Sequence, residues 1–180
     1  MSRFLLILVS LLVCASVAGS GAIRASTSAA PSWKIVALGD SDATGQGDPT
    51  RVGWAGRYAN RLRQRLGLTV SVVNLAHEGM TSRQLLASVR SDPSTRSALK
   101  GAQIVLLGIG GADMNGGDTR LQSGKCQPEA CYAAVMKAFG RNFDATAASI
   151  QSMKRGSRFV LRAITPETSA PRRTPPGISE

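Results

Sequence analysis

Short apolar segments alternate along this chain with longer segments in which apolar residues recur every three or four positions. Four short segments, rich in β-branched residues, are predicted as strands: 34–38, 69–75, 103–109 and 158–164. The third of them is almost wholly apolar, as is typical of a strand that helices cover on both faces. Buried parallel strands are therefore the first expectation.

Three longer segments carry the helical pattern. In residues 54–66 the apolar side chains are four positions apart, and residues 81–89 begin at Thr81 or Ser82, either of which can cap a helix. Residues 128–155 form a long helical stretch, which we expect to be broken near Gly140. Strand and helix thus alternate, which predicts an α/β fold in three layers: a parallel sheet with helices on both faces.

The first residues have the pattern of a targeting segment. A short basic start precedes an apolar run of ten residues, 4–13, and small residues follow it. That run is too short to span a membrane, so residues 1–18 are predicted to be a secretory signal peptide cleaved after Ala18. Cys14 offers the alternative of a lipid-attachment site, although a bulky valine precedes it. Residues 19–32 are small and polar and are predicted to be a flexible linker. We therefore expect a secreted protein.

Composition limits the rest of the chain to one ordinary domain. The chain has 180 residues, of which 43% are hydrophobic, and residues 33–165 hold the predicted strands and helices. Residues 166–180 are rich in proline and lack apolar periodicity, so we expect a disordered tail.

The balance of charge is strongly basic. The formal net charge is +11, but the basic residues are scattered. Arg57, Arg61 and Arg65 would share one helix face, which either contacts an anionic surface weakly or is simply solvated. Aromatic residues make up only 4% of the chain, so a base-stacking platform and specific nucleic-acid binding are not expected.

Two cysteines remain after the predicted signal peptide. Cys126 and Cys131 are separated by four residues, and in an oxidising compartment this pair is expected to form a local disulfide. A zinc site is a poor alternative, because two thiols and one distant histidine make no recognisable ligand set.

Three glycine-bearing motifs follow the first three predicted strands. Gly39-Asp40-Ser41 follows the first strand, residues 74–79 (NLAHEG) follow the second, and residues 110–113 (GGAD) follow the third. Ligands bind at the carboxyl ends of strands in open parallel sheets, so the three loops should meet around one pocket. A serine at such a turn is well placed as a nucleophile whose oxyanion is held by neighbouring N–H groups.

These motifs resemble a known family. The segments KIVALGDSDATGQGD, VVNLAHEGMTS and GIGGADMN are similar to the first three conserved blocks of the GDSL, or SGNH, hydrolases. The resemblance implies a flavodoxin-like layout and hydrolysis of carboxylic esters, such as acyl lipids or acetylated sugars. It implies Ser41 as the nucleophile and first oxyanion donor through its N–H, and Gly79 as the second donor. Asp40 matches the acidic residue that supports the nucleophile turn.

The chain departs from the family pattern at the third oxyanion donor. The family has Asn before Asp in its third block, but this chain has Ala112, which cannot donate. Loss of one such donor typically costs ~3–4 kcal/mol of transition-state stabilisation. Asn115 and Asn74 are the nearby side chains considered as replacements.

The second departure concerns the general base. The family's Asp-x-x-His block is missing from the 180 residues, and the only histidine is His77. His77 lies two residues before Gly79 and is therefore the one candidate base. The sequence after residue 164 does not continue the strand–helix pattern, so the domain is expected to be incomplete at its C-terminal end. Without a base, the oxyanion site and binding alone can still give ~10³–10⁴-fold acceleration over water.

The sequence thus predicts a secreted serine ester hydrolase of this class, impaired because its base is missing. The alternative is a non-catalytic secreted protein that binds acyl or glycan ligands or anionic envelope polymers. No cofactor motif is present: the phosphate-binding G-x-x-x-x-G-K-[ST] pattern is missing, and the glycines at 108–111 lack dinucleotide spacing. The expected partner is a small-molecule ester; no bound metal and no membrane-spanning segment are expected, and the protein should be a monomer.

Overall fold

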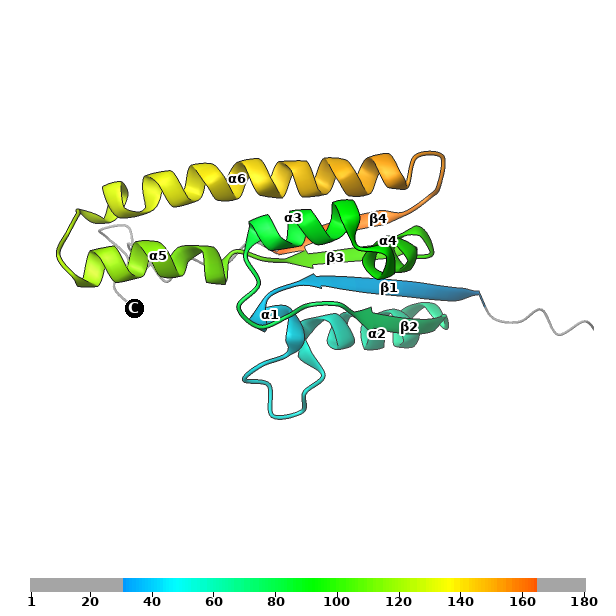
Figure 1. Cartoon of the computed structure of the whole chain (residues 1–180). Coiled ribbons are helices and arrows are strands. Elements are labelled where there is room, and N and C mark those ends of the chain that lie inside the picture. The colour runs from blue at the N-terminus through cyan, green and yellow to red at the C-terminus, as the bar shows by residue number, and fades with distance from the viewer. Residues whose placement is uncertain (1–30, 165–180) are drawn as a thin grey trace, which may run out of the picture.

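The computed structural model describes residues 31–164, and its centre is one parallel sheet (Figure 1). The strands are β1 (Ser32–Gly39), β2 (Thr69–Asn74), β3 (Ile104–Gly108) and β4 (Val160–Ile164). Their order in the sheet is β2-β1-β3-β4, and all three pairings are parallel. These four strands follow the strand order of flavodoxin-like folds, so the predicted fold class is confirmed.

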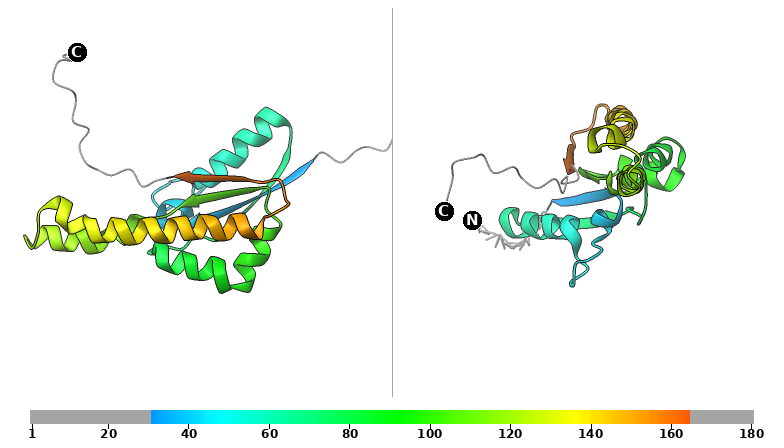
Figure 2. Two further views of the ribbon diagram at one scale, coloured as in Figure 1. Left: turned by 90° about the horizontal axis from the view of Figure 1, so that it is seen from above. Right: turned by 90° about the vertical axis from the view of Figure 1, so that its left-hand side faces the viewer.

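Helices cover both faces of the sheet, as the turned views in Figure 2 show. Helix α2 (Gly53–Leu66) lies on one face. Three helices lie on the other: α3 (Ser82–Ser91), α4 (Pro93–Lys100) and α6 (Pro128–Met153). Two further helices, α1 (Ser41–Thr44) and α5 (Gly111–Gln122), begin where β1 and β3 end.

Strand β1 divides the core between these two layers. Its side chains alternate, so that Ile35 and Ala37 pack with the α2 layer while Val36 and Leu38 pack with α3 and α6. All four side chains are at most 1% exposed. Burial on both faces explains why the central strands are continuous apolar runs rather than alternating ones.

Helix α3 begins as its sequence predicts. Thr81 is the N-cap, and the side chains of Thr81 and Gln84 each bond to the other's backbone N–H, which is a capping box. Leu85 and Val89 then face the core and are buried. Asp92 ends α3 and caps α4 with its side chain, so the two helices meet in a sharp corner. Neither α4 nor the short α1 was predicted from the sequence.

The predicted break at Gly140 is wrong, because α6 runs without interruption from Pro128 to Met153. A glycine inside a helix costs only ~1 kcal/mol relative to alanine. Phe139 and Phe143 flank the glycine and pack with the core and with each other, with ring centroids 5.7 Å apart. The free energy gained from this packing exceeds the cost of the glycine, so the helix continues past Gly140.

Helices α5 and α6 form a hairpin that projects beyond the strand ends on the α1 side (Figure 1). The sequence led us to expect a loop at residues 110–113, but α5 already begins at Gly111. At the tip of the hairpin the sulfur atoms of Cys126 and Cys131 lie 2.01 Å apart, next to the start of α6.

A buried lysine fixes the opposite end of α6. Lys154 is 4% exposed, and its ammonium group donates to the carbonyl oxygens of Lys100 and Ala102 at 2.9 and 2.6 Å. The first carbonyl is at the last residue of α4 and the second follows the helix, so the contact joins the end of α6 to the turn that leads into β3. Burial lowers the pKa of the Lys154 ammonium.

Several predictions fall outside the described residues. The signal peptide at 1–18, most of the linker at 19–32 and the tail at 166–180 lie there, and they stay predictions. The last linker residue does not fit, because β1 already begins at Ser32. Within residues 31–164, no helix combines the length and apolarity needed to cross a membrane.

Candidate active site

The site is built where β1 and β3 end side by side. A side chain on Gly39 would place its Cβ 1.7 Å from the carbonyl oxygen of Gly108, and the φ of Gly39 is +150°. Only glycine fits so close to the neighbouring strand. This approach lets the Asp40 N–H donate to the Gly108 carbonyl at 3.1 Å, which extends the pairing of β1 with β3.

Asp40 joins the first motif to the third. Its side chain is buried, and one carboxylate oxygen accepts the N–H groups of Gly110 and Gly111 at 3.0 and 2.9 Å. The other oxygen accepts the N–H of Asp42 at 3.4 Å and so caps α1. Asp40 therefore holds the turn that contains Ser41, while the family role that the resemblance implies for it stays a prediction.

Ser41 is the first residue of α1 and directly follows this anchored aspartate. Its carbonyl oxygen accepts the Thr44 hydroxyl at 2.7 Å and the Gln46 N–H at 3.2 Å, which fixes the backbone of the turn. Its side chain is partly buried. Among the hydrogen bonds of residues 31–164, none involves the Ser41 hydroxyl or the Ser41 N–H. Both groups are thus left to interact with a ligand.

The second motif lies at the same edge of the sheet. After β2 the backbone continues beside β1: the N–H of Leu75 donates to Ala37 at 2.8 Å, and that of His77 donates to Gly39 at 3.0 Å. Gly79 follows in the left-handed region with φ of +72°, and a Cβ there would meet no atom within 4 Å. Its N–H has no acceptor within the described part of the chain, and the residue is exposed.

Two side-chain contacts tie this second loop to α1. The Asn74 amide donates to the carbonyl of Ala43 at 2.8 Å, and its oxygen accepts the N–H of Ala76 at 3.1 Å. Gln46 donates to Glu78 at 2.9 Å, and both of these side chains are exposed. The Asn74 side-chain amide is therefore already used to hold the loop against α1. It is not free to replace the missing oxyanion donor.

The third motif supplies no matching donor in the described structure. Ala112 lies in the first turn of α5, where its methyl group cannot form a hydrogen bond. Asn115 lies on the next turn and is exposed; its carbonyl accepts the Thr119 hydroxyl at 2.9 Å, and nothing engages its amide. Of the two suggested replacements, only Asn115 keeps a side chain without a competing contact among residues 31–164.

Sequence reasoning missed a second buried connection, from Asp113. Its carboxylate accepts the backbone N–H of Ser82 at 2.8 Å and the Ser82 hydroxyl at 2.6 Å. Asn142 of α6 donates to the same hydroxyl at 3.0 Å. The third motif is thereby joined to the start of α3 and to α6. The available signal was an aspartate shortly after the third predicted strand and a serine at the start of a predicted helix, which we treated only as a cap.

The candidate base His77 is exposed, and only its backbone is engaged. Its N–H binds Gly39, and its carbonyl accepts the N–H of Met80 at 3.1 Å. Within residues 31–164 no hydrogen bond joins the imidazole to Ser41. The structure thus gives a backbone role for His77, and its role as a base stays a prediction.

An ordered loop connects α1 to α2 beside the site. The Asp48 carboxylate accepts the Thr50 hydroxyl at 2.7 Å and the Gly53 N–H at 2.9 Å, and it pairs with Arg57 at 2.6 Å. These contacts, the Thr50 hydroxyl foremost, lower the pKa of Asp48 to about 2. Arg57, one of the three arginines predicted to share a face of α2, therefore also pairs with the carboxylate that holds this loop.

No group of three histidine, cysteine, aspartate or glutamate side chains in the described residues is arranged to bind a metal ion. The arrangement instead offers a hydroxyl, two free N–H groups and a fixed turn. Such a set suits attack on a carbonyl carbon with stabilisation of the resulting oxyanion.

Comparison with known proteins found similarity both in sequence and in structure. In sequence, the chain is 37% identical to the uncharacterized protein YpmR of Bacillus subtilis (strain 168) over 81 residues, which are 44% of this chain and 31% of that protein. In structure, it is similar to the lipase Lip_vut3 from a goat rumen metagenome, with a TM-score of 0.67 and 22% identity. That match covers 73% of this chain and 62% of the lipase.

A second similar structure comes from Parabacteroides merdae ATCC 43184, a protein assigned as a GDSL-like lipase, with a TM-score of 0.50 and 16% identity. The match covers 73% of this chain and 59% of that one. The chain thus spans less than two thirds of the length of these relatives. The family model for the GDSL-like lipases and acylhydrolases matches residues 37–180. On this match, the chain belongs to the GDSL-like lipase/acylhydrolase family.

Proposed function

We propose that the chain hydrolyses carboxylic esters through Ser41, at a low rate. The Ser41 oxygen attacks the acyl carbon, the ester C–O bond breaks, and the alcohol leaves with a proton, so that an acyl-serine remains. Water then attacks the acyl-serine, which releases the acid and restores the hydroxyl. The N–H groups of Ser41 and Gly79 stabilise the oxyanion in both steps.

The observation that carries this proposal is the pair of N–H groups without an acceptor in the described structure, on turns that follow two neighbouring strands. Backbone donors held by a fixed fold need little reorganisation during the reaction. Asp40 adds to this by holding the Ser41 turn against the third motif through two N–H bonds.

The low rate follows from two residues. Ala112 removes the third donor, and the exposed His77 forms no hydrogen bond with the Ser41 hydroxyl within residues 31–164. The Ser41 hydroxyl then has to attack the ester without a positioned base to take its proton. We expect acceleration of at most ~10³–10⁴ over the uncatalysed reaction.

The test is hydrolysis of short p-nitrophenyl esters by the full chain, compared with Ser41→Ala. Ser97→Ala is the matched control, since Ser97 is exposed on α4 and far along the chain from the motifs. The proposal expects Ser41→Ala to lose the rate above background while Ser97→Ala retains it. Acylation of Ser41 by a fluorophosphonate, detected by mass spectrometry, provides a second measurement.

A non-catalytic binding protein is the second candidate, and Ala112 is the residue that favours it. In that case the pocket would hold an acyl or glycan ligand without turnover. Equal rates for the wild type and Ser41→Ala, combined with saturable binding of an ester by both, would select this candidate over the hydrolase.

We further propose that the protein is exported, as a monomer, with a disulfide between Cys126 and Cys131. Export rests on the sequence pattern at residues 1–18, and the disulfide is supported by the placement of both sulfurs at the tip of the hairpin. Labelling of free thiols before and after reduction, on protein collected from the extracellular medium, tests both statements. Light scattering of the same sample tests the monomer.

A weak contact with anionic surfaces is proposed for α2. This helix contains four arginines and no acidic residue, and Arg61 and Arg65 are exposed and form no ion pair among residues 31–164. Like charges at this spacing destabilise a helix slightly. The arginines therefore add no stability to a face that is only solvated, which favours a contact with an anionic surface. Retention on an anionic resin that falls with salt and with Arg61→Gln/Arg65→Gln is the expected result.

A further inference from the structure

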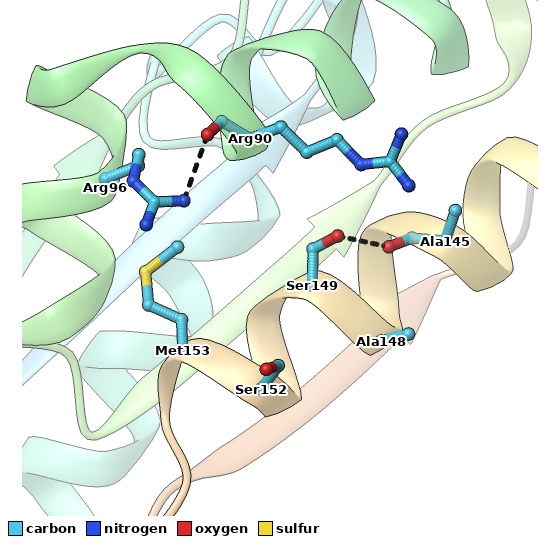
Figure 3. A pocket seen from close by; sticks show the side chains of 7 residues that line it. All are labelled: Arg90, Arg96, Ala145, Ala148, Ser149, Ser152 and Met153. Atoms are coloured by element: carbon cyan, nitrogen blue, oxygen red, sulfur yellow. Dashed lines mark hydrogen bonds between the residues drawn. The ribbon is translucent and has the colours of Figure 1, made fainter.

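A groove lies between α6 and the corner where α3 meets α4, away from the candidate active site. It has a volume of about 580 Å³ (Figure 3). The start of α3 contacts the third motif through Ser82, whereas the groove borders the last turn of α3 at Arg90. Eight residues of helix separate these two positions by ~12 Å. Any ligand of the groove is therefore separate from an ester bound at Ser41.

Two arginines from different helices flank the groove. The guanidinium of Arg96 donates from one nitrogen to the carbonyls of Val89 and Arg90, at 3.2 and 3.1 Å. This contact caps the end of α3 and fixes the Arg96 side chain, while its other nitrogens are not engaged by residues 31–164. The Arg90 side chain extends across the groove toward α6, above Ser149 and Ala145 (Figure 3).

The α6 side of the groove is made of small side chains. Ala145, Ala148, Ser149 and Ser152 line it, with Met153 at one end. The Ser149 hydroxyl donates to the Ala145 carbonyl at 2.6 Å, whereas Ser152 is exposed and its hydroxyl has no partner among the described residues. The groove exists because these short side chains leave room beneath the two guanidinium groups.

No carboxylate neutralises these arginines within residues 31–164, where the ion pair present is Arg57–Asp48. The nearest acid along the chain, Asp92, accepts the Thr95 N–H at 2.7 Å and the Ser94 hydroxyl at 2.6 Å at the start of α4. Asp144 precedes the groove on α6, is exposed, and also lies beyond ion-pair distance of both arginines. The positive charge of the groove is thus available to a ligand.

We propose that this groove binds the phosphoryl group of a small, soluble phosphorylated molecule. A carboxylate has two oxygens in one plane and is satisfied by one arginine fork. A phosphoryl group directs three oxygens outward and suits more than one arginine fork, here those of Arg90 and Arg96 from different helices. The volume lies within the ~300–1,000 Å³ usual for small-molecule sites.

The test is calorimetric titration of the full chain with pyrophosphate at constant ionic strength. Saturable binding is expected for the wild type. Ala148→Glu places a carboxylate under the arginines at an exposed helix position, and Ala134→Glu is its matched control on the same helix, away from the groove. We expect roughly tenfold weaker binding for Ala148→Glu and less than about twofold change for Ala134→Glu.

A second pair of variants separates the groove from net charge. Arg90→Gln and Arg61→Gln remove the same charge from exposed positions on different helices. The proposal expects Arg90→Gln to weaken pyrophosphate binding by roughly tenfold and Arg61→Gln to leave it within about twofold. Equal weakening by both variants, no saturable binding by the wild type, or binding that Ala148→Glu does not change would each overturn it. Binding that persists in Ser41→Ala supports a site separate from the ester pocket.

Discussion

The turn after β1 and the loop after β2 lie at the same edge of the sheet, yet they are held in different ways. The first is fixed by the buried carboxylate of Asp40, which reaches across to two N–H groups of the third motif. The second is exposed from His77 to Gly79 and is held by backbone bonds, by the Asn74 amide that donates to Ala43 and by the surface contact of Glu78 with Gln46. The backbone of Ser41, the proposed nucleophile, is therefore more firmly held than that of Gly79, the proposed second oxyanion donor.

This difference matters for catalysis because an oxyanion hole works only when its donors are already in place. In the described structure, Asp40 and Asp113 tie the first and third motifs into the core, and Asp113 also fixes the start of α3. Gly79 is joined to this framework by the short segment that precedes α3 and by the bond from the His77 N–H to the Gly39 carbonyl. A ligand that contacts Gly79 would thus bind to the more adjustable side of the pocket.

The largest effect should come from Asp40→Ala. The change leaves the buried N–H of Gly110 and the N–H of Gly111 without their acceptor, and unsatisfied buried donors cost ~1–3 kcal/mol each. We expect a loss of roughly 2–4 kcal/mol in the free energy of unfolding, measured by urea denaturation.

Asp42→Ala is the control for this measurement, because Asp42 is exposed on the same short helix and should change stability by less than about 0.5 kcal/mol. Similar small losses for both variants would mean that the Asp40 carboxylate does not hold the two motifs together, and the contrast between turn and loop would disappear.

Much of the fold could be predicted from the sequence because local pattern and tertiary packing agree there. The central strands β1 and β3 are apolar runs buried on both faces, and α2 and α3 carry an apolar face and, for α3, a capping box. Gly140 shows where local preference fails: the packing of Phe139 and Phe143 maintains the helix past a weak helix former. Helix α5 was missed because its glycine-rich sequence has little apolar periodicity.

The site was predicted less completely, because its supports are long-range contacts between polar residues. The motif order placed Ser41 and Gly79 at neighbouring strand ends, as strand geometry requires. The hydrogen bonds between Asp113 and Ser82 and between Asn74 and Ala43 each join residues 31 positions apart. No local sequence pattern predicts contacts of that separation. The groove at Arg90 and Arg96 likewise depends on which face of α6 packs beside α3 and α4.

The next largest effect is expected for Asp113→Ala. This change removes the acceptor of the Ser82 N–H and hydroxyl, and Ser82 is 1% exposed, so roughly 2 kcal/mol of unfolding free energy should be lost. Asp144→Ala, at an exposed position of α6, should change stability by less than about 0.5 kcal/mol. If Asp113→Ala loses no more unfolding free energy than this control, the Asp113 carboxylate does not anchor the third motif, and only Asp40 would distinguish the turn from the loop.

Gly79→Ala tests the adjustable side directly. Its φ of +72° disfavours a side chain by ~1 kcal/mol, while the space around it is open, so only a modest loss of stability is expected. Gly67→Ala is a matched control with φ of +62° and the same open surroundings, at the end of α2. Both should lose similar stability by urea denaturation, but only Gly79→Ala should lower the rate of ester hydrolysis. Alanine keeps the backbone N–H, so equal rates for the two variants would show that the left-handed conformation at residue 79 is not needed to place this donor.

Glu78→Ala should have the smallest effect. Its contact with Gln46 joins two exposed side chains, and surface contacts of this kind contribute little because water competes for both partners and ordering them costs entropy. We expect a change of less than about 0.5 kcal/mol in urea denaturation, and the same for Gln46→Ala and for the double variant. A loss above about 1 kcal/mol that is not additive between the two single variants would show that the loop after β2 is anchored as firmly as the turn after β1. In that event Gly79 would be held in place as rigidly as Ser41, and a low rate of hydrolysis would have to come from the missing base and Ala112 alone.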